Sequence, residues 1–481
     1  MRTLAAIGQR SPLSRYLTRA LLDRVTRNQL RRLVLDNGLR VLMAPNPVGA
    51  SIGVAVHYGV GFRTEPKGHT GLAHLFEHLV FQGGRRAAPE GYLPQVQRAG
   101  GFGDARTRQD VTVYYAAAPA SALEMLLALE ADRMRSPRIS ERNLRTQTAV
   151  IDEEIRLMVR NRPYGAFPWV LPRALHRRAE NTRDGYGETV DLAAFDIPLC
   201  ERFFADHYGP ANTVVTLTGA FDPGTAERLV RSHFERLSAR PPVAAPDVHE
   251  PLPREERRLT VADPHAGSPA VAVGYRMPDP VTERAGYLAH LVLAALLGQG
   301  RHALLRRGPT AAAGVSSLSV GCGLFGLPLD TAGPDLLTLF AVHEHEHGAE
   351  DVLAALDSTL EALARDEVDG GLLRATTARW AAGSLRELGD PGTRAQLLGL
   401  REALFGEAEL TQALPELVRT GVSGEQVSRA AARLRSSHRA VVRFVPGEPG
   451  EPGEAGEAGE AAPRGSAREK REPREKREKA A

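Results

Sequence analysis

The chain has 481 residues, of which 42% are hydrophobic and 25% charged, and its formal net charge is +3. This length exceeds one compact core, so we expect two domains, and the composition is that of a soluble globular protein. The small net charge argues against nucleic-acid binding, and no apolar run is long enough to predict a membrane-spanning helix. Two distant cysteines, Cys200 and Cys322, exclude a disulfide framework and a cysteine-based zinc site.

Residues 1–27 form an arginine-rich N-terminal extension. The first 32 residues contain eight arginines and one acid, Asp23. We favour a helical extension of a bacterial protein located in the cytoplasm. Mitochondrial targeting by this arm is the alternative, because transit peptides share the composition.

The predicted first domain covers residues 28–238. It begins with a β-hairpin, because two short apolar runs flank Asp36-Asn37-Gly38. Strand-like and helical patterns then alternate. The expected strands are 52–58, 111–117 and 213–218, and the expected helices are 122–134, 144–158 and 226–237.

Residues 239–256 are rich in proline and are predicted to be a linker. A second domain follows at 257–446 and restarts the pattern. Its expected strands are 258–262, 270–275 and 336–342, and its expected helices are 287–297, 349–364 and 371–387. Two halves with similar order favour a duplicated domain. The Gly/Glu repeats and charged end of residues 447–481 predict a disordered tail.

The residues with the clearest chemistry are His74, Glu77 and His78, which form a His-x-x-Glu-His pattern. On a helix, histidines four apart project from one face and can bind one metal ion. Glu77 reaches the rim of that site and can hold a metal-bound water as a general base. Apolar neighbours on both sides are expected to bury the helix and fix the directions of the rings.

A catalytic zinc site needs a third protein ligand and one open position. The candidates are carboxylates on a second helix. Asp152, Glu153 and Glu154 all compete for this role, and spacing alone does not choose between them.

The pattern and its surroundings resemble the pitrilysin-type zinc metallopeptidases, or inverzincins. The similarity is greatest to the short two-domain members, such as the β subunit of the mitochondrial processing peptidase and bacterial processing-protease-like proteins. Besides the zinc motif, the segments that resemble the family are 58–63, 100–107, 203–219, 276–278 and 296–298. The resemblance runs from about residue 30 to residue 445.

This resemblance implies an α+β fold of two homologous domains. Each is expected to be an antiparallel-rich β-sheet with helices packed on one face, and together they would form a clamshell. It also implies a zinc-dependent endopeptidase in which His74, His78 and Glu154 bind zinc and Glu77 is catalytic. An edge strand would hold an extended peptide substrate by β-augmentation. Its substrate-binding residues would be Phe102, Gly103, Asp104 and Ala105.

Three positions depart from the family pattern. Asp104 replaces the usual asparagine of the edge strand, either to favour basic substrates or without functional consequence. Gln147 replaces a glutamate on the helix of the third ligand. In the second domain, Arg307 aligns with a substrate-capping arginine, but Gly314 occupies the position of the tyrosine that stabilises the oxyanion. Losing one oxyanion donor typically costs about a hundredfold in rate.

We therefore expect either a weak peptidase or the zinc-bearing subunit of a dimer, paired with a second family subunit or with its own copy. The alternative function is a noncatalytic or weakly active scaffold that binds peptides. A further histidine-rich segment, residues 343–347, is interpreted as a surface loop able to capture metal by accident. Trp169 is interpreted as a packing residue.

Overall fold

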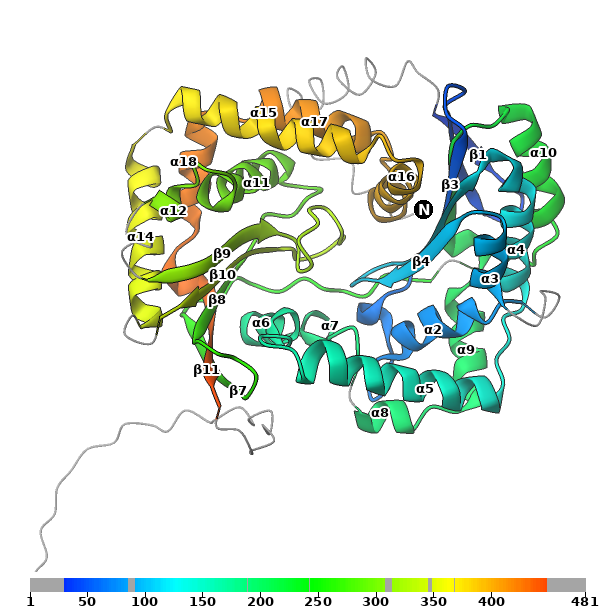
Figure 1. Cartoon of the computed structure of the whole chain (residues 1–481), viewed down its shortest axis with the longest axis horizontal. Helices are drawn as coiled ribbons and strands as arrows, with labels where there is room; N and C mark the ends of the chain where they lie inside the picture. Colours follow the sequence, from blue (N-terminus) through cyan, green and yellow to red (C-terminus); the bar gives the residue numbers. More distant parts are fainter. Residues whose placement is uncertain are drawn as a thin grey trace, which may run out of the picture.

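The computed structural model describes residues 30–84, 91–187, 189–241, 243–307, 314–344, 348–366 and 368–447. Two β-sheets lie at the centres of two halves of the molecule (Figure 1). This is the α+β arrangement of two homologous domains that the sequence predicts. The arginine-rich extension and nearly all of the charged tail lie outside the described residues.

The first half contains a six-stranded sheet with the order β1-β2-β6-β3-β5-β4. Its strands are β1 (Arg31–Val34), β2 (Arg40–Pro45), β3 (Ser51–Tyr58), β4 (Phe102–Thr107), β5 (Thr112–Pro119) and β6 (Thr213–Gly219). β1 pairs antiparallel with β2, which confirms the predicted hairpin. Only the β2–β6 pair is parallel, and β4 forms one edge of the sheet.

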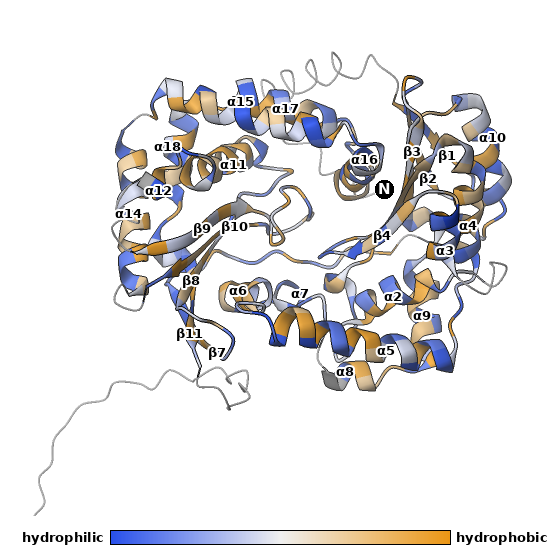
Figure 2. Ribbon diagram, in the orientation of Figure 1, coloured by the Kyte–Doolittle hydropathy of each residue, from blue (hydrophilic) through white to orange (hydrophobic). Residues whose placement is uncertain are grey.

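The helices of the first half are α2 (Leu72–Phe81), α3 (Tyr92–Arg98), α4 (Leu123–Arg135), α5 (Glu141–Ile155), α6 (Phe167–Leu175), α7 (Ala179–Thr182), α8 (Thr189–Ala193), α9 (Ile197–His207) and α10 (Pro223–Phe234). Ser140 and Asp222 cap α5 and α10 by accepting hydrogen bonds from backbone amides. The helices mix hydrophobic and hydrophilic residues (Figure 2), as amphipathic helices against a core do.

The second half contains a five-stranded sheet with the order β7-β11-β8-β10-β9. Its strands are β7 (Arg257–Asp263), β8 (Ala270–Arg276), β9 (Val315–Cys322), β10 (Leu336–His343) and β11 (Arg439–Pro446). Its helices are α11 (Arg284–Gly298), α12 (Leu304–Arg307), α14 (Ala349–Arg365), α15 (Gly370–Glu387), α16 (Pro391–Phe405), α17 (Leu410–Gly421) and α18 (Gly424–Arg433). None of the described helices is long and apolar enough to cross a membrane.

Each sheet receives one helix from the opposite half of the chain. α16 belongs to the second half but packs on β3 and β6 of the first sheet, and α6 belongs to the first half but packs on β8 and β11 (Figure 1). Leu171 of α6 lies with Ala272 and Val442 of the second sheet in one buried cluster. The sequence predicted helices on one face of each sheet. The second face is also covered, by this exchanged helix.

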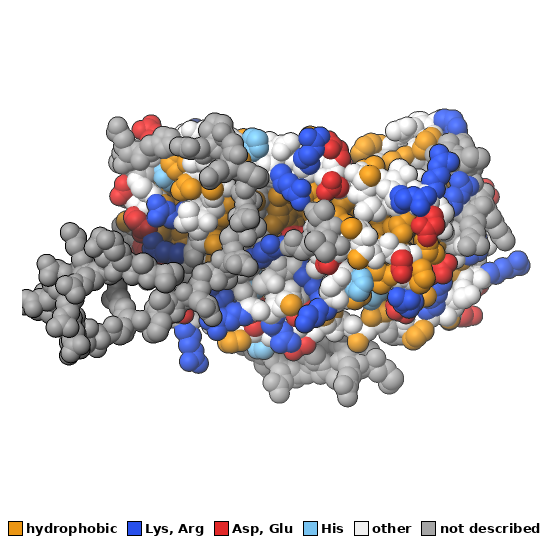
Figure 3. Space-filling model, turned by 90° about the horizontal axis from the view of Figure 1, so that it is seen from below, with side chains coloured by type: hydrophobic (Ala, Val, Ile, Leu, Met, Phe, Trp, Pro, Cys, Tyr) orange, Lys and Arg blue, Asp and Glu red, His pale blue; other side chains and the backbone are white. Residues whose placement is uncertain are grey.

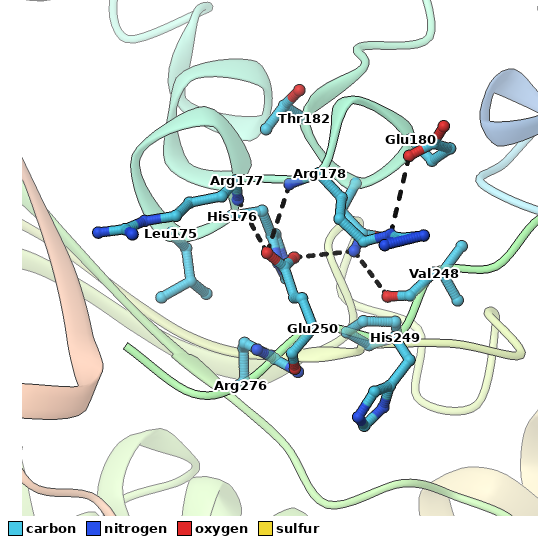
Figure 4. A network of polar contacts seen from close by, with 12 residues as sticks. Leu175, His176, Arg177, Arg178, Glu180, Thr182, Val248, His249, Glu250 and Arg276 are labelled. Atoms are coloured by element: carbon cyan, nitrogen blue, oxygen red, sulfur yellow. Dashed lines mark hydrogen bonds and ion pairs between the residues drawn. The ribbon is translucent and has the colours of Figure 1, made fainter. Parts of the chain in front are cut away.

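The linker between the halves is anchored by a buried carboxylate. Glu250 accepts hydrogen bonds from Asn181 Nδ2 at 2.8 Å and from the amide of Arg177 at 2.9 Å, and its Oε1 lies 2.6 Å from His176 Nδ1. Figure 4 shows this carboxylate pointing into the turn that follows α6. The carbonyl of Glu250 accepts a bond from Arg276 of β8. The linker thereby connects the end of α6 to the second sheet.

Candidate metal centre

The centre is built on α2, whose apolar side chains are buried in the core of the first half. Gly71 precedes the helix with a φ of 87°, a left-handed conformation that glycine adopts without strain. His74 is only 7% exposed. Nε2 of His74 lies 3.3 Å from Nε2 of His78, so the spacing of four places both imidazoles on one side of the helix as predicted.

Glu154 of α5 completes the cluster. Its Oε2 lies 3.4 Å from Nε2 of His78 and 3.8 Å from Nε2 of His74. Two ligands held about 2.1 Å from a tetrahedral zinc ion are about 3.4 Å apart, so the three donor atoms have the spacing of a zinc site. Their ligand atoms all lie within 4.8 Å of one another, and no other group of three or more His, Cys, Asp or Glu side chains in the described part of the chain is arranged in this way.

The other two candidate carboxylates of α5 point elsewhere. Glu153 is exposed and forms an ion pair with Arg156 at 2.5 Å, and Asp152 is exposed. The second oxygen of Glu154 accepts a hydrogen bond from the Tyr186 hydroxyl at 3.1 Å. The geometry therefore favours Glu154 among the alternatives that spacing left open.

Two further side chains orient the centre. Oε1 of Gln147 lies 3.3 Å from Nδ1 of His78, so the glutamine still contacts the ring nitrogen that faces away from the cluster. The hydroxyl of Thr107, at the end of β4, donates to Oε2 of Glu77 at 2.6 Å. This bond holds the Glu77 carboxylate between the edge strand and α2.

Electrostatics separate the two histidines. Burial lowers the pKa of His74 to about 4, and the nearby His78 adds to this effect, so its imidazole is neutral at pH 7, as metal binding requires. Burial acts to lower the pKa of His78, but its hydrogen bond to Glu154 and the charge of Glu77 outweigh burial and raise it. Burial also raises the pKa of Glu77, against the opposing hydrogen bond from Thr107.

The centre opens into a cleft of about 540 Å³ between the two halves. His74, Glu77 and Glu154 line it together with the end of β4, and Phe325 and Phe340 contribute from the second half. The cleft contains six aromatic side chains among its 19 lining residues, although aromatic residues make up 5% of the chain. Trp169, which the sequence suggested was a packing residue, is one of them.

The predicted substrate strand lies at the free edge of the first sheet. Phe102 and Asp104 are exposed, Gly103 is half-buried and Ala105 is buried, which is the alternation of a strand with one face against α2. Ala105 also lines the cleft, whereas Asp104 is not among the lining residues. The Asp104 carboxylate accepts a hydrogen bond from the Tyr115 hydroxyl at 3.1 Å.

The predicted capping residues of the second domain are only partly described. Arg307 ends α12, but its side chain lies outside the described residues. Gly314 precedes β9 with a φ of 63°, which disfavours a tyrosine at this position. His343 ends β10 and is buried, and its Nδ1 lies 3.0 Å from the carbonyl oxygen of Glu344. The rest of the histidine-rich segment, 345–347, lies outside the described residues.

Sequence reasoning missed four side chains of this site: Thr107, Arg108, Trp169 and Tyr186. Strand alternation gave a signal for Thr107, since it lies two residues after Ala105 and therefore faces α2. Tyr186 follows α7 in an irregular segment and had no such signal.

Two family descriptions match this sequence. The insulinase type of peptidase family M16 matches residues 40–183, which contain the metal centre, and the inactive domain of peptidase family M16 matches residues 200–375. The chain belongs to peptidase family M16. The zinc protease PqqE of Helicobacter pylori is 29% identical over 57% of this M16 chain and 62% of its own length. An uncharacterised zinc protease of Mycobacterium bovis is 28% identical over 78% of this chain and 84% of its own length.

Solved structures share the fold. A protease from Helicobacter pylori has a TM-score of 0.78 and 23% identity over 87% of this chain and 100% of that chain. Pitrilysin has a TM-score of 0.70 and 16% identity, and the match covers 88% of this chain but 45% of pitrilysin. The match to the periplasmic protease PqqL of Escherichia coli covers 47% of PqqL. This chain therefore spans about half the length of the larger structural relatives.

Proposed function

We propose that this M16 chain is a zinc-dependent endopeptidase that cleaves extended peptides or unstructured polypeptide segments. The observation that carries the proposal is the convergence of His74 Nε2, His78 Nε2 and Glu154 Oε2 at tetrahedral-ligand spacing, beside a half-buried fourth group, Glu77. Zinc held there would supply a Lewis acid that polarises the scissile carbonyl.

Glu77 is the group placed for proton transfer. It accepts the proton of the attacking water and passes it to the leaving amine, a role that suits a half-buried carboxylate whose pKa is raised. Thr107 fixes one oxygen of this carboxylate, and Glu77 lines the cleft. Tyr186 holds Glu154 by its second oxygen and positions the ligand.

The free edge of β4 supports the mode of substrate binding. β4 pairs with β5 on one side only, and its last residues line the cleft beside Glu77. A peptide that adds to this edge is held mainly through its backbone, which requires an extended chain. Phe102, Gly103, Asp104 and Ala105 would form the start of this binding edge.

We further propose that this chain works as the zinc-bearing subunit of a dimer. The match to half of pitrilysin and of PqqL supports this, because those proteins are long enough to contain two such units. Gly314 supports it as well, since a partner would have to supply the missing oxyanion donor. A noncatalytic peptide-binding subunit is the alternative, and the match of residues 200–375 to an inactive domain is compatible with it. A cytoplasmic location, rather than a mitochondrial one, remains our prediction.

The test compares the wild-type chain with Glu77→Gln. Each is assayed for bound zinc by metal analysis and for cleavage of a flexible 20-residue peptide by mass spectrometry. We expect equal zinc content in the two proteins and hydrolysis in the wild type only. Zinc binding without hydrolysis in the wild type, alone and with a family partner, would support the scaffold instead. Light scattering under the assay conditions gives the molar mass of the active species. Full activity of a monomer would refute the dimer.

A further inference from the structure

The cleft beside the metal centre is cationic as well as aromatic. Three arginines line it: Arg106 of β4, Arg108 just after this strand, and Arg162 in the loop before α6. The acidic lining residues are Glu77 and Glu154, which both belong to the metal centre. Away from that centre, the described cleft therefore carries positive charge without acidic side chains.

Two of these three arginines have no ion-pair partner in the part of the chain that the structure describes. Within the described residues, Arg106 contacts Tyr115, whose hydroxyl accepts its hydrogen bond at 3.2 Å, and neither Arg106 nor Arg162 forms an ion pair. The carboxylate nearest to Arg108 is that of Asp330 in the second half, at 3.8 Å. Burial and the neighbouring Asp335 raise the pKa of Asp330, which weakens the charge that Asp330 offers to Arg108. Arg108 also donates a hydrogen bond to the carbonyl of Thr107, so Arg106 and Arg162 are the arginines that remain available to a ligand.

A continuous aromatic wall joins Arg108 to the metal centre. The ring centroids of His74 and Tyr186 lie 5.1 Å apart, and those of Tyr186 and Trp169 lie 5.0 Å apart. The Trp169 ring lies 5.3 Å from the ring of Phe325, and the Arg108 guanidinium stacks over Phe325 at 4.4 Å. A substrate at the metal centre would thus meet a large apolar surface that ends in a fixed cation.

The edge strand brings a second cation to the same peptide. Asp104 is the register partner of Tyr115, and Arg106, two residues further on, lies on the same face of the sheet. A peptide paired with β4 would place one of its side chains about 5 Å from Arg106. Asp104 already accepts the Tyr115 hydroxyl and lies outside the cleft lining, so it gives little reason to expect a preference for basic substrates.

We propose that this cleft selects peptide segments in which acidic side chains flank an aromatic or large apolar residue near the scissile bond. This inference rests on the proposed peptidase function and adds its substrate class. Arginine suits the role because its planar guanidinium binds carboxylates through two hydrogen bonds and also stacks on aromatic rings. A basic side chain at the same subsites would face like charges in a partly buried cleft, which is costly.

The experiment uses three decapeptides that differ only in the residues flanking a central phenylalanine, which are glutamate, glutamine or lysine. Binding of fluorescein-labelled peptides to the zinc-loaded Glu77→Gln protein is measured by anisotropy, and cleavage by the wild type is measured as kcat/KM. We expect about tenfold tighter binding for glutamate than for glutamine, and about tenfold again over lysine, with the same order in kcat/KM. The preference should shrink in high salt, because the arginines are partly exposed.

Variants locate the effect in the cleft. Arg106→Gln combined with Arg162→Gln should reduce the preference for glutamate over lysine to less than about fivefold. Arg106→Glu should favour lysine. Arg435→Gln is the matched control, because Arg435 is exposed in the second half and is not among the cleft residues. It should leave the preference unchanged.

The two proposals fail in different ways. Selective binding of the acidic peptide without cleavage by the wild type, alone and with a family partner, would refute the peptidase and keep the substrate class. Cleavage of all three peptides at similar rates would refute the substrate class and keep the peptidase. Equal binding of the three peptides, no binding of any, or a preference that survives the double substitution would overturn the inference.

Discussion

The buried carboxylate of the linker gives a prediction about stability. In Glu250→Gln, one acceptor oxygen becomes an amide group that faces a donor, either the amide of Arg177 or the side chains of His176 and Asn181. An unsatisfied buried donor costs about 1–3 kcal/mol, and the remaining hydrogen bonds lose the assistance of the charge. Because Glu250 is 8% exposed, we expect a loss of about 3 kcal/mol in the free energy of unfolding.

The effect should depend on pH in a defined direction. Burial acts to raise the pKa of Glu250, but the hydrogen bonds from His176, the Arg177 amide and Asn181 outweigh burial and lower it. A carboxylate with a depressed folded pKa stabilises the protein above its unfolded pKa of about 4.3, and this contribution is lost as the pH falls further. The difference between wild type and variant should therefore be largest at neutral pH and should shrink below about pH 4.

Urea unfolding at pH 7.5, 5 and 3.5 measures this difference, with tryptophan fluorescence, to which Trp169 on the adjacent α6 contributes, as one signal. Glu255→Gln is the matched control, since Glu255 is an exposed glutamate of the same linker. If Glu250→Gln is as stable as Glu255→Gln at pH 7.5, or if the gap widens in acid, the hydrogen-bond reasoning is wrong.

Two further predictions concern the metal and the exchanged helix. Glu154→Gln should lower the affinity for zinc at least about a hundredfold, measured by competition with a chromophoric chelator. Glu153→Gln should leave the affinity unchanged, because Glu153 faces solvent. Equal zinc affinities of the two variants would exclude Glu154 as a ligand. Gly399→Ala on α16 should destabilise the protein by about 1–3 kcal/mol in urea unfolding, because the new Cβ would lie 2.4 Å from the ring of His57. Gly383→Ala, at a helical glycine with open space around it, should be neutral or stabilising, and a neutral result at Gly399 would contradict the tight packing of α16.

Much of the site could be predicted because it is local. Helical periodicity alone places His74, Glu77 and His78 together, and the structure keeps them so. Spacing alone did not choose Glu154 over Glu153, because it does not fix the rotation of α5 relative to α2; the family resemblance implied Glu154. Tyr186 contacts Glu154 from an irregular segment, where no helical or strand periodicity predicts the position of a side chain.

In the fold as well, local elements could be predicted and long-range packing could not. Most strands, but fewer than half of the described α-helices, were predicted from the sequence; the hydrophobic periods of β3 and α14 are regular. The exchange of α6 and α16 was not predicted. An amphipathic helix reveals that one face is buried, but the pattern does not identify the sheet that buries it. Leu398 of α16 therefore appears as a core residue in the sequence, although its core belongs to the other half.

The second half carries none of the predicted metal ligands but contributes to the cleft through Phe325 and Phe340. Figure 3 shows basic, acidic and hydrophobic side chains interspersed on the face seen from below, so charges of one sign do not dominate this face. The second half instead acts inside the molecule. Phe325 supports Arg108, and Arg63 of the first half donates to Thr331 and to the carbonyl of Pro334 in the loop beyond Phe325. With α16 packed on β3, the second half holds this loop against the edge strand and so fixes one wall of the cleft.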